Sequence, residues 1–165
     1  MERSNYADIS SELKKLGSYQ VGGGIVGLMR MVKGFFLQSN SSGLTLMFYL
    51  LMISFFSYSV YCGVLCLNGM KKALQQSQIN QILQVFGIAL MGFAFQYVAG
   101  VYLFIGLDLA NDINITFGAG ISTFNFNINK QHHRVDVSFN LVAFAFIYWI
   151  DQLMKKVKLQ ASQKL

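Results

Sequence analysis

The sequence predicts an all-α integral membrane protein with three transmembrane helices. Its 165 residues are 54% hydrophobic and only 12% charged, whereas a soluble domain of this size contains about 25% charged residues. Long apolar stretches occupy residues 44–67 and 80–107, and a shorter one occupies 138–155. Proline is absent, which favours unbroken helices. The apolar excess is therefore expected to face lipid.

The stretch 44–67 contains no charged side chain, and as a helix it would extend roughly 36 Å, beyond the roughly 30 Å hydrocarbon core of a bilayer. Small side chains lie within it. Ser59 and Gly63 are four residues apart, a spacing that lets a second helix approach closely, and Cys62 and Cys66 adjoin them. We interpret these four residues as a helix-packing face. A soft metal ion at the two thiols is not predicted, because no histidine or third thiol is nearby.

In the second predicted span, Gly92, Gln96 and Gly100 recur at every fourth residue. On a helix they would form a smooth stripe with one amide at mid-membrane. Interhelical hydrogen bonds of this kind contribute roughly 0.6 kcal/mol on average, so the stripe is expected to pack against the first span or another chain. The alternative is a homo-oligomeric pore or channel subunit with Gln96 facing the lumen.

Residues 1–43 are predicted to be an N-terminal amphipathic interfacial segment. Val21, Ile25, Leu28 and Val32 follow helical spacing on one side, and glycines and basic residues occupy the other. The alternative is a fourth transmembrane helix over 16–37. Four spans would distribute the basic residues as the positive-inside rule prefers, whereas three spans would leave them nearly balanced.

Between the last two spans, residues 112–137 change period. Apolar and polar residues alternate at 113–117, 124–128 and 135–139, which is typical of strands. A turn at 130–133 would join the last two of these into a small β-hairpin. The other interpretation is that this segment is part of the last helix. Together with a basic C-terminal tail, these elements give a membrane domain over 44–165.

The formal charge of +6 suggests contact with anionic headgroups rather than with nucleic acid. The residues expected at the membrane surface are basic and flank the predicted spans: Arg30, Lys33, Lys71, Lys72, Lys155, Lys156 and Lys158. The tail is predicted on the cytoplasmic or matrix side of a bacterial or organellar inner membrane.

The sequence contains no recognisable catalytic arrangement. His132 and His133 are adjacent, so on a strand they point to opposite faces and cannot chelate one ion together. We therefore predict a non-enzymatic protein without a metal or cofactor. Small-residue helix faces favour an accessory or assembly subunit of a larger membrane complex. Its expected partners are membrane lipids, other subunits and further copies of itself.

Overall fold

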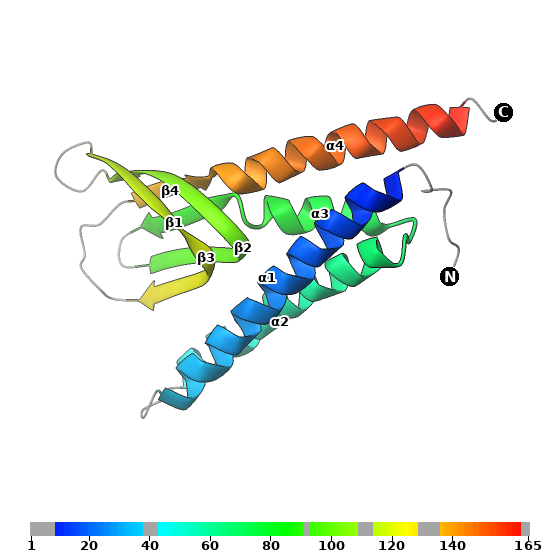
Figure 1. Cartoon of the computed structure of the whole chain (residues 1–165). Helices are drawn as coiled ribbons and strands as arrows, with labels where there is room; N and C mark the ends of the chain where they lie inside the picture. The colour runs from blue at the N-terminus through cyan, green and yellow to red at the C-terminus, as the bar shows by residue number, and fades with distance from the viewer. Residues whose placement is uncertain (1–8, 38–42, 91–92, 109–113, 129–135, 163–165) are drawn as a thin grey trace.

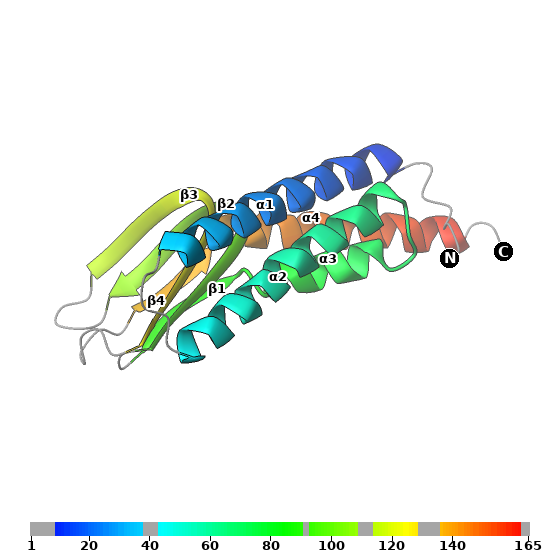
Figure 2. The ribbon, with the colours of Figure 1, turned by 90° about the horizontal axis from the view of Figure 1, so that it is seen from below.

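The computed structural model describes residues 9–37, 43–90, 93–108, 114–128 and 136–162. Within these ranges the chain is a mixture of helices and one antiparallel sheet (Figure 1). The elements are α1 (Ser10–Leu37), α2 (Gly43–Leu67), α3 (Ala73–Ile82), β1 (Phe86–Leu90), β2 (Phe93–Asp108), β3 (Asn114–Ile128), β4 (Asp136–Asn140) and α4 (Leu141–Ser162). The sheet forms one end of an elongated molecule, and the helices extend from it (Figures 1 and 2).

The predicted all-α protein with three transmembrane helices is wrong. The span expected over 80–107 is the end of α3 followed by β1 and nearly all of β2. Among the described helices only α2, over Leu46–Leu67, is long and apolar enough to cross a membrane. The same finding contradicts the fourth span over 16–37 and the last span over 138–155. The description of the chain as an integral membrane protein with several transmembrane helices is therefore not supported.

Helix α1 is continuous, and the side predicted to be its polar face is its buried side. Gly17, Gly23, Gly24 and Gly27 are buried. A Cβ atom built on Gly17 would lie 2.8 Å from the carbonyl oxygen of Gly63 in α2. The glycines thus bring the two helix backbones close together, while Ile25, Met29 and Val32 of α1 are exposed.

The sheet closes on itself through β2. Strand order is β1-β4-β2-β3, with a further pairing between β1 and β2. The beginning of β2 pairs with β1, its end pairs with β4, and β1 pairs with β4, as the positions Gly87↔Gln96, Gly106↔Ser138 and Gly87↔Ser138 show. Three strands therefore form a small ring, and β3 follows β2 along the outside.

The predicted hairpin within 112–137 is wrong. Strands β3 and β4 do not pair with each other, because each pairs with β2. Nor is this segment part of the last helix, since α4 begins at Leu141. The alternation of side chains was a real indication of strands, but the partner strand lies in a region that was expected to be helical.

A bend in the sheet receives α1. Gly100 in β2 has φ +120° and Ser122 in β3 has φ +36°, and the strand register shifts between Val98 and Val101. The Ser122 hydroxyl donates to the carbonyl oxygen of Gly23 at 2.8 Å, and the Tyr19 hydroxyl donates to the carbonyl oxygen of Val101 at 3.1 Å. These bonds fix α1 to the bend.

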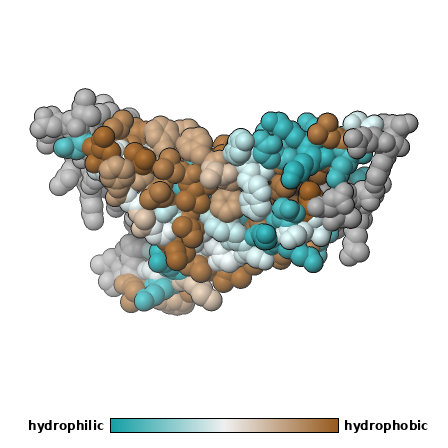
Figure 3. Space-filling view, turned by 45° about the horizontal axis from the view of Figure 1, so that its top comes forward, coloured by the Kyte–Doolittle hydropathy of each residue, from teal (hydrophilic) through white to brown (hydrophobic). Residues whose placement is uncertain are grey.

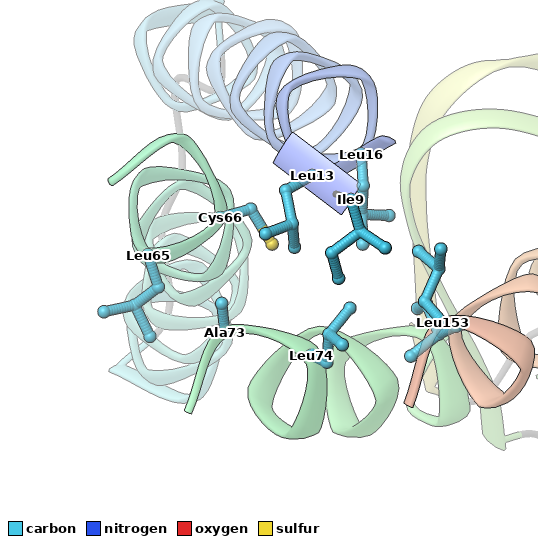
Figure 4. Close-up of a cluster of buried hydrophobic side chains, with 9 residues drawn as sticks. Ile9, Leu13, Leu16, Leu65, Cys66, Ala73, Leu74 and Leu153 are labelled. Carbon is cyan, nitrogen blue, oxygen red and sulfur yellow. The ribbon is translucent and has the colours of Figure 1, made fainter. Parts of the chain in front are cut away.

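At the opposite end of the molecule the four helices share an apolar cluster (Figure 4). Its buried members are Ile9, Leu13, Leu16, Leu65, Cys66, Ala73, Leu74, Ile150 and Leu153. A second cluster joins α2 to the sheet through Phe56, Tyr97 and Ala99. Between the two clusters the interior is polar, and this region is the candidate site.

Candidate functional site

A buried polar seam lies where α1, α2, α3 and the residues after α3 meet. Its members are uncharged and almost fully buried: Gln20, Ser59, Ser77, Asn80, Gln81 and Gln84. Helix α3 positions Ser77, Asn80 and Gln81, because its buried face repeats at helical spacing from Ala73 through Ser77 to Gln81. This arrangement is not evident from the sequence, because glutamine, asparagine and serine side chains are ordinarily exposed.

Hydrogen bonds connect the seam across three helices. The Ser77 hydroxyl donates to Oε1 of Gln20 at 3.0 Å. The Ser59 hydroxyl donates to the carbonyl oxygen of Gln20 at 3.1 Å, and Nδ2 of Asn80 donates to Oγ of Ser59 at 3.2 Å. Because every one of these groups is neutral, the seam joins the helices without burying a charge.

Tyr97 extends the seam into the sheet. Its hydroxyl donates to the carbonyl oxygen of Phe55 at 2.8 Å and lies 3.5 Å from Oδ1 of Asn80. Burial raises the pKa of Tyr97 well above its usual range, so the hydroxyl keeps its proton and remains a donor. Burial also raises the pKa of Tyr19 to about 12, which preserves its bond to Val101.

Three glutamines leave part of their hydrogen-bonding capacity unused. Oε1 of Gln84 accepts from the backbone N–H of Ala99 at 2.9 Å. Nε2 of Gln20, Nε2 of Gln84 and both polar atoms of Gln81 have no hydrogen-bond partner among the described residues. A buried amide without a partner costs about 1–3 kcal/mol, so Gln81 is the member of the seam with the least favourable energy.

The predicted helix-packing face in α2 lies inside the molecule. Ser59 bonds to Gln20, Gly63 touches α1, and Sγ of Cys66 is 3.1 Å from Oγ of Ser77. Sγ of Cys62 is 3.4 Å from the carbonyl oxygen of Gln76, to which it donates. Helices of the same chain therefore occupy this face.

The predicted Gly92/Gln96/Gly100 stripe does not exist as a helical stripe. Gln96 and Gly100 lie on β2, and Gly92 falls outside the described residues. Gly100 lies against α1 at Gly23 rather than against the Ser59 face of α2. Gln96 pairs in the sheet with Gly87 and Asn125, so no observation favours a helical pore lined by this amide.

The basic residues divide into two groups. Lys71 and Lys72 precede α3, and Lys155, Lys156 and Lys158 lie in the second half of α4, at the end of the molecule opposite the sheet (Figure 1). Lys14 and Lys15 lie at the same end, because they stand between Leu13 and Leu16 of the first apolar cluster. Lys155 also forms an ion pair with Asp151 at 2.7 Å. Arg30 and Lys33 belong to the other half of α1.

Large exposed apolar side chains gather on the other half of the molecule, on the face that Figure 3 shows. On the helices the exposed members include Ile25, Met29, Val32, Phe36, Leu46, Met47, Leu50, Leu51, Phe144 and Tyr148. On the sheet they include Val101, Leu103, Leu107, Ile115, Phe117 and Ile121. We call this set the apolar surface. This half of the molecule therefore exposes many large apolar side chains on both its helices and its sheet.

The described residues contain no group of three or more His, Cys, Asp or Glu side chains placed to hold a metal ion. No protein-family model, curated protein or solved structure matches the chain. Its fold and the placement of its side chains therefore carry the functional argument.

Proposed function

We propose that this protein is a non-enzymatic accessory or assembly protein that is held at a lipid membrane by its apolar surface. The observation that carries the proposal is the apolar surface, a set of large exposed side chains on α1, α2, α4 and the sheet that lies away from Lys71, Lys72 and the lysines of α4. Contiguous exposed apolar patches beyond a few hundred Å² mark binding surfaces for membranes or proteins.

The two longest helices contribute much of the apolar surface. Helix α2 directs Ser59, Gly63 and Cys66 inward, while Met47, Leu50 and Leu51 are exposed. Helix α1 packs through glycines and exposes Ile25, Met29 and Val32. Small residues at helix contacts and polar side chains as internal bonds are the pattern of helices whose outer surface meets lipid.

The lysines lie at the end where headgroups would be. Helix α2 begins at Gly43 near the apolar end and finishes at Leu67, shortly before Lys71 and Lys72. At 1.5 Å per residue its length is about 37 Å, comparable with one bilayer. Each basic residue near an anionic leaflet contributes about 1 kcal/mol to attraction, so this end would favour a negatively charged membrane surface.

The proposed role is non-enzymatic because the buried hydroxyls have structural partners. The hydroxyls of Ser59, Ser77 and Tyr97 bond to amide or carbonyl oxygens, and none is paired with a histidine or carboxylate that would activate it. Neutral amide and hydroxyl networks of this kind specify how helices pack. A scaffold that joins a membrane to other proteins requires such packing and no catalytic group.

Flotation with lipid vesicles tests the proposal. The full chain, diluted from detergent into phosphatidylcholine vesicles with or without phosphatidylserine, is expected to float with both, and more completely with the anionic lipid. The double variant Met47→Lys/Leu50→Lys is expected to reduce the floating fraction at least ten-fold. This estimate follows because a lysine in hydrocarbon costs roughly 3 kcal/mol and about 1.4 kcal/mol corresponds to a factor of ten.

Leu159→Lys is the matched control, since Leu159 is 64% exposed but lies in the basic half of α4. It should float like the original chain. Circular dichroism should show the same helix content in all three proteins. If the unsubstituted chain stays folded and remains at the bottom of the gradient with both lipids, the proposal is wrong.

A further inference from the structure

We infer that two copies of this chain pair edge to edge through β3 as an antiparallel dimer. This inference goes beyond the proposed function and does not depend on it. It begins from the sheet topology. Strand β1 has β2 on one side and β4 on the other, β4 lies between β1 and β2, and β2 pairs along β3 as well as with β1 and β4. Among the described strands, β3 alone has an open edge.

The open edge lacks the features that normally prevent strand addition. Unpaired N–H and C=O groups along an edge recruit another strand unless lysine, proline or a cover blocks them. Strand β3 reads NITFGAGISTFNFNI, without a charged residue or a proline. Its side chains Ile115, Phe117 and Ile121 are exposed, and Phe117 is exposed to 74%. Such an edge is typical of an interface.

A bend limits the length that a new strand can follow. Residues 114–121 pair with 101–108 of β2 in an unbroken register, and the shift comes at Ser122, where φ is +36°. Nη1 of Arg30 donates to the carbonyl oxygen of Ser122 at 2.8 Å, which covers the edge at this point. The partner strand is therefore expected to cover about seven residues, up to Ile121.

The charge distribution favours a second copy as the partner. An acidic or basic peptide would find no charged residue on β3, and the neighbouring Arg30 already donates to the carbonyl oxygen of Ser122. A second β3 is itself uncharged, and the lysines around α3 and the end of α4 lie at the other end of the molecule (Figure 1). Two copies, each with a formal charge of +6, can therefore meet at β3 while their basic ends remain far apart.

Two-fold symmetry then selects a register. Residues opposite each other in an antiparallel pair point to the same face of the sheet. A two-fold axis perpendicular to the sheet must therefore place one residue directly opposite the same residue of the second copy. An axis at Gly118 places Phe117 opposite Ala119 of the second copy and Ile115 opposite Ile121. A large side chain then lies beside a small one, and the apolar outer face continues across the dimer.

Gly118 offers a direct test of this register. A Cβ atom built there meets no heavy atom within 4 Å, so Gly118→Cys should fold normally. On the axis, Gly118 faces its own copy with Cα atoms about 5 Å apart, which is within the range of a disulfide. The two native cysteines are buried, so the new thiol is the accessible one.

The purified full-length chain in mild detergent is treated with copper phenanthroline, which accepts the two electrons released when two thiols form a disulfide. Gly118→Cys is expected to give a covalent dimer within minutes. Leu103→Cys is the control, because Leu103 is exposed but lies on β2, one strand from the edge. It should crosslink at least ten-fold more slowly.

Mass measurement by light scattering gives a second, independent test. The unsubstituted chain is expected to be a dimer, Phe117→Lys a monomer and Leu103→Lys a dimer. Both lysine variants remove one apolar side chain from the apolar surface, so weaker vesicle flotation would affect them equally and would concern the membrane proposal instead. A monomeric unsubstituted chain, or equal crosslinking at positions 118 and 103, would overturn the dimer.

Discussion

Replacing Gly23 by alanine is expected to lower the free energy of unfolding by about 2–3 kcal/mol. A Cβ atom at this position would lie 2.5 Å from the backbone nitrogen of Gly100 and 2.6 Å from the carbonyl carbon of Ala99. Both are backbone atoms at the bend of β2, so no side-chain rotation relieves the overlap. Overpacking of this kind costs typically 1–3 kcal/mol, and here it also separates α1 from the sheet.

Gly22→Ala is the matched control for this prediction. Gly22 is the preceding residue of the same helix, and a Cβ atom there would meet nothing within 4 Å. Alanine is a better helix former than glycine, so this variant is expected to gain up to about 1 kcal/mol. Thermal unfolding followed by circular dichroism in one detergent compares the two. Equal melting temperatures would show that α1 does not contact the bend at Gly23.

The same substitution at two neighbouring glutamines is expected to have opposite effects. Gln81→Met should raise the free energy of unfolding by about 1–2 kcal/mol, because it replaces a buried amide that has no partner among the described residues. Gln84→Met should lower it by about 1–3 kcal/mol, because the backbone N–H of Ala99 loses its acceptor inside the molecule. Both side chains are 1% exposed, so burial does not separate them.

Chemical denaturation in the same detergent measures both glutamine variants. The two variants are compared by the sign of the change in the free energy of unfolding, because the sign is less sensitive to the denatured state than the size of the change. A loss of stability in Gln81→Met, equal to the loss in Gln84→Met, would contradict the assignment of Gln81 as an unpaired amide. It would mean that the Gln81 amide is hydrogen-bonded in the folded protein.

The sequence identified a helix over 44–67 because both its length and the absence of charge point to it, and α2 covers Gly43–Leu67. It did not separate helix from strand in the second apolar stretch. An uncharged run with aromatic and small residues satisfies either, since its backbone bonds can be made within a helix or across a sheet. The aromatics at Phe93, Phe95 and Tyr97 do alternate, which was the available indication of β2.

The polar seam could not be predicted because local composition contradicted it. The segment around α3 is rich in glutamine and serine, which ordinarily indicates exposure, yet Ser77 and Gln81 are buried. Only the meeting of three helices gives these side chains partners. The glycines of α1 were visible in the sequence, but their buried orientation depends on Gly63 and on the bend at Gly100, both distant in the chain.

The closed ring of strands determines when the chain can complete its fold. Strand β4 pairs with both β1 and β2, and Oδ1 of Asn140 accepts from the backbone N–H groups of Leu103 and Val142 at 3.3 and 3.2 Å. During synthesis, β1 and β2 emerge long before residues 136–140. Until then, the edges of β1 and β2 that pair with β4 in the folded protein have no partner strand. Such distant pairing slows folding and exposes strands to wrong partners. The ring therefore closes only when residues 136–140 have been synthesised, and a ribosome-bound chain ending before residue 136 should be protease-sensitive throughout its sheet.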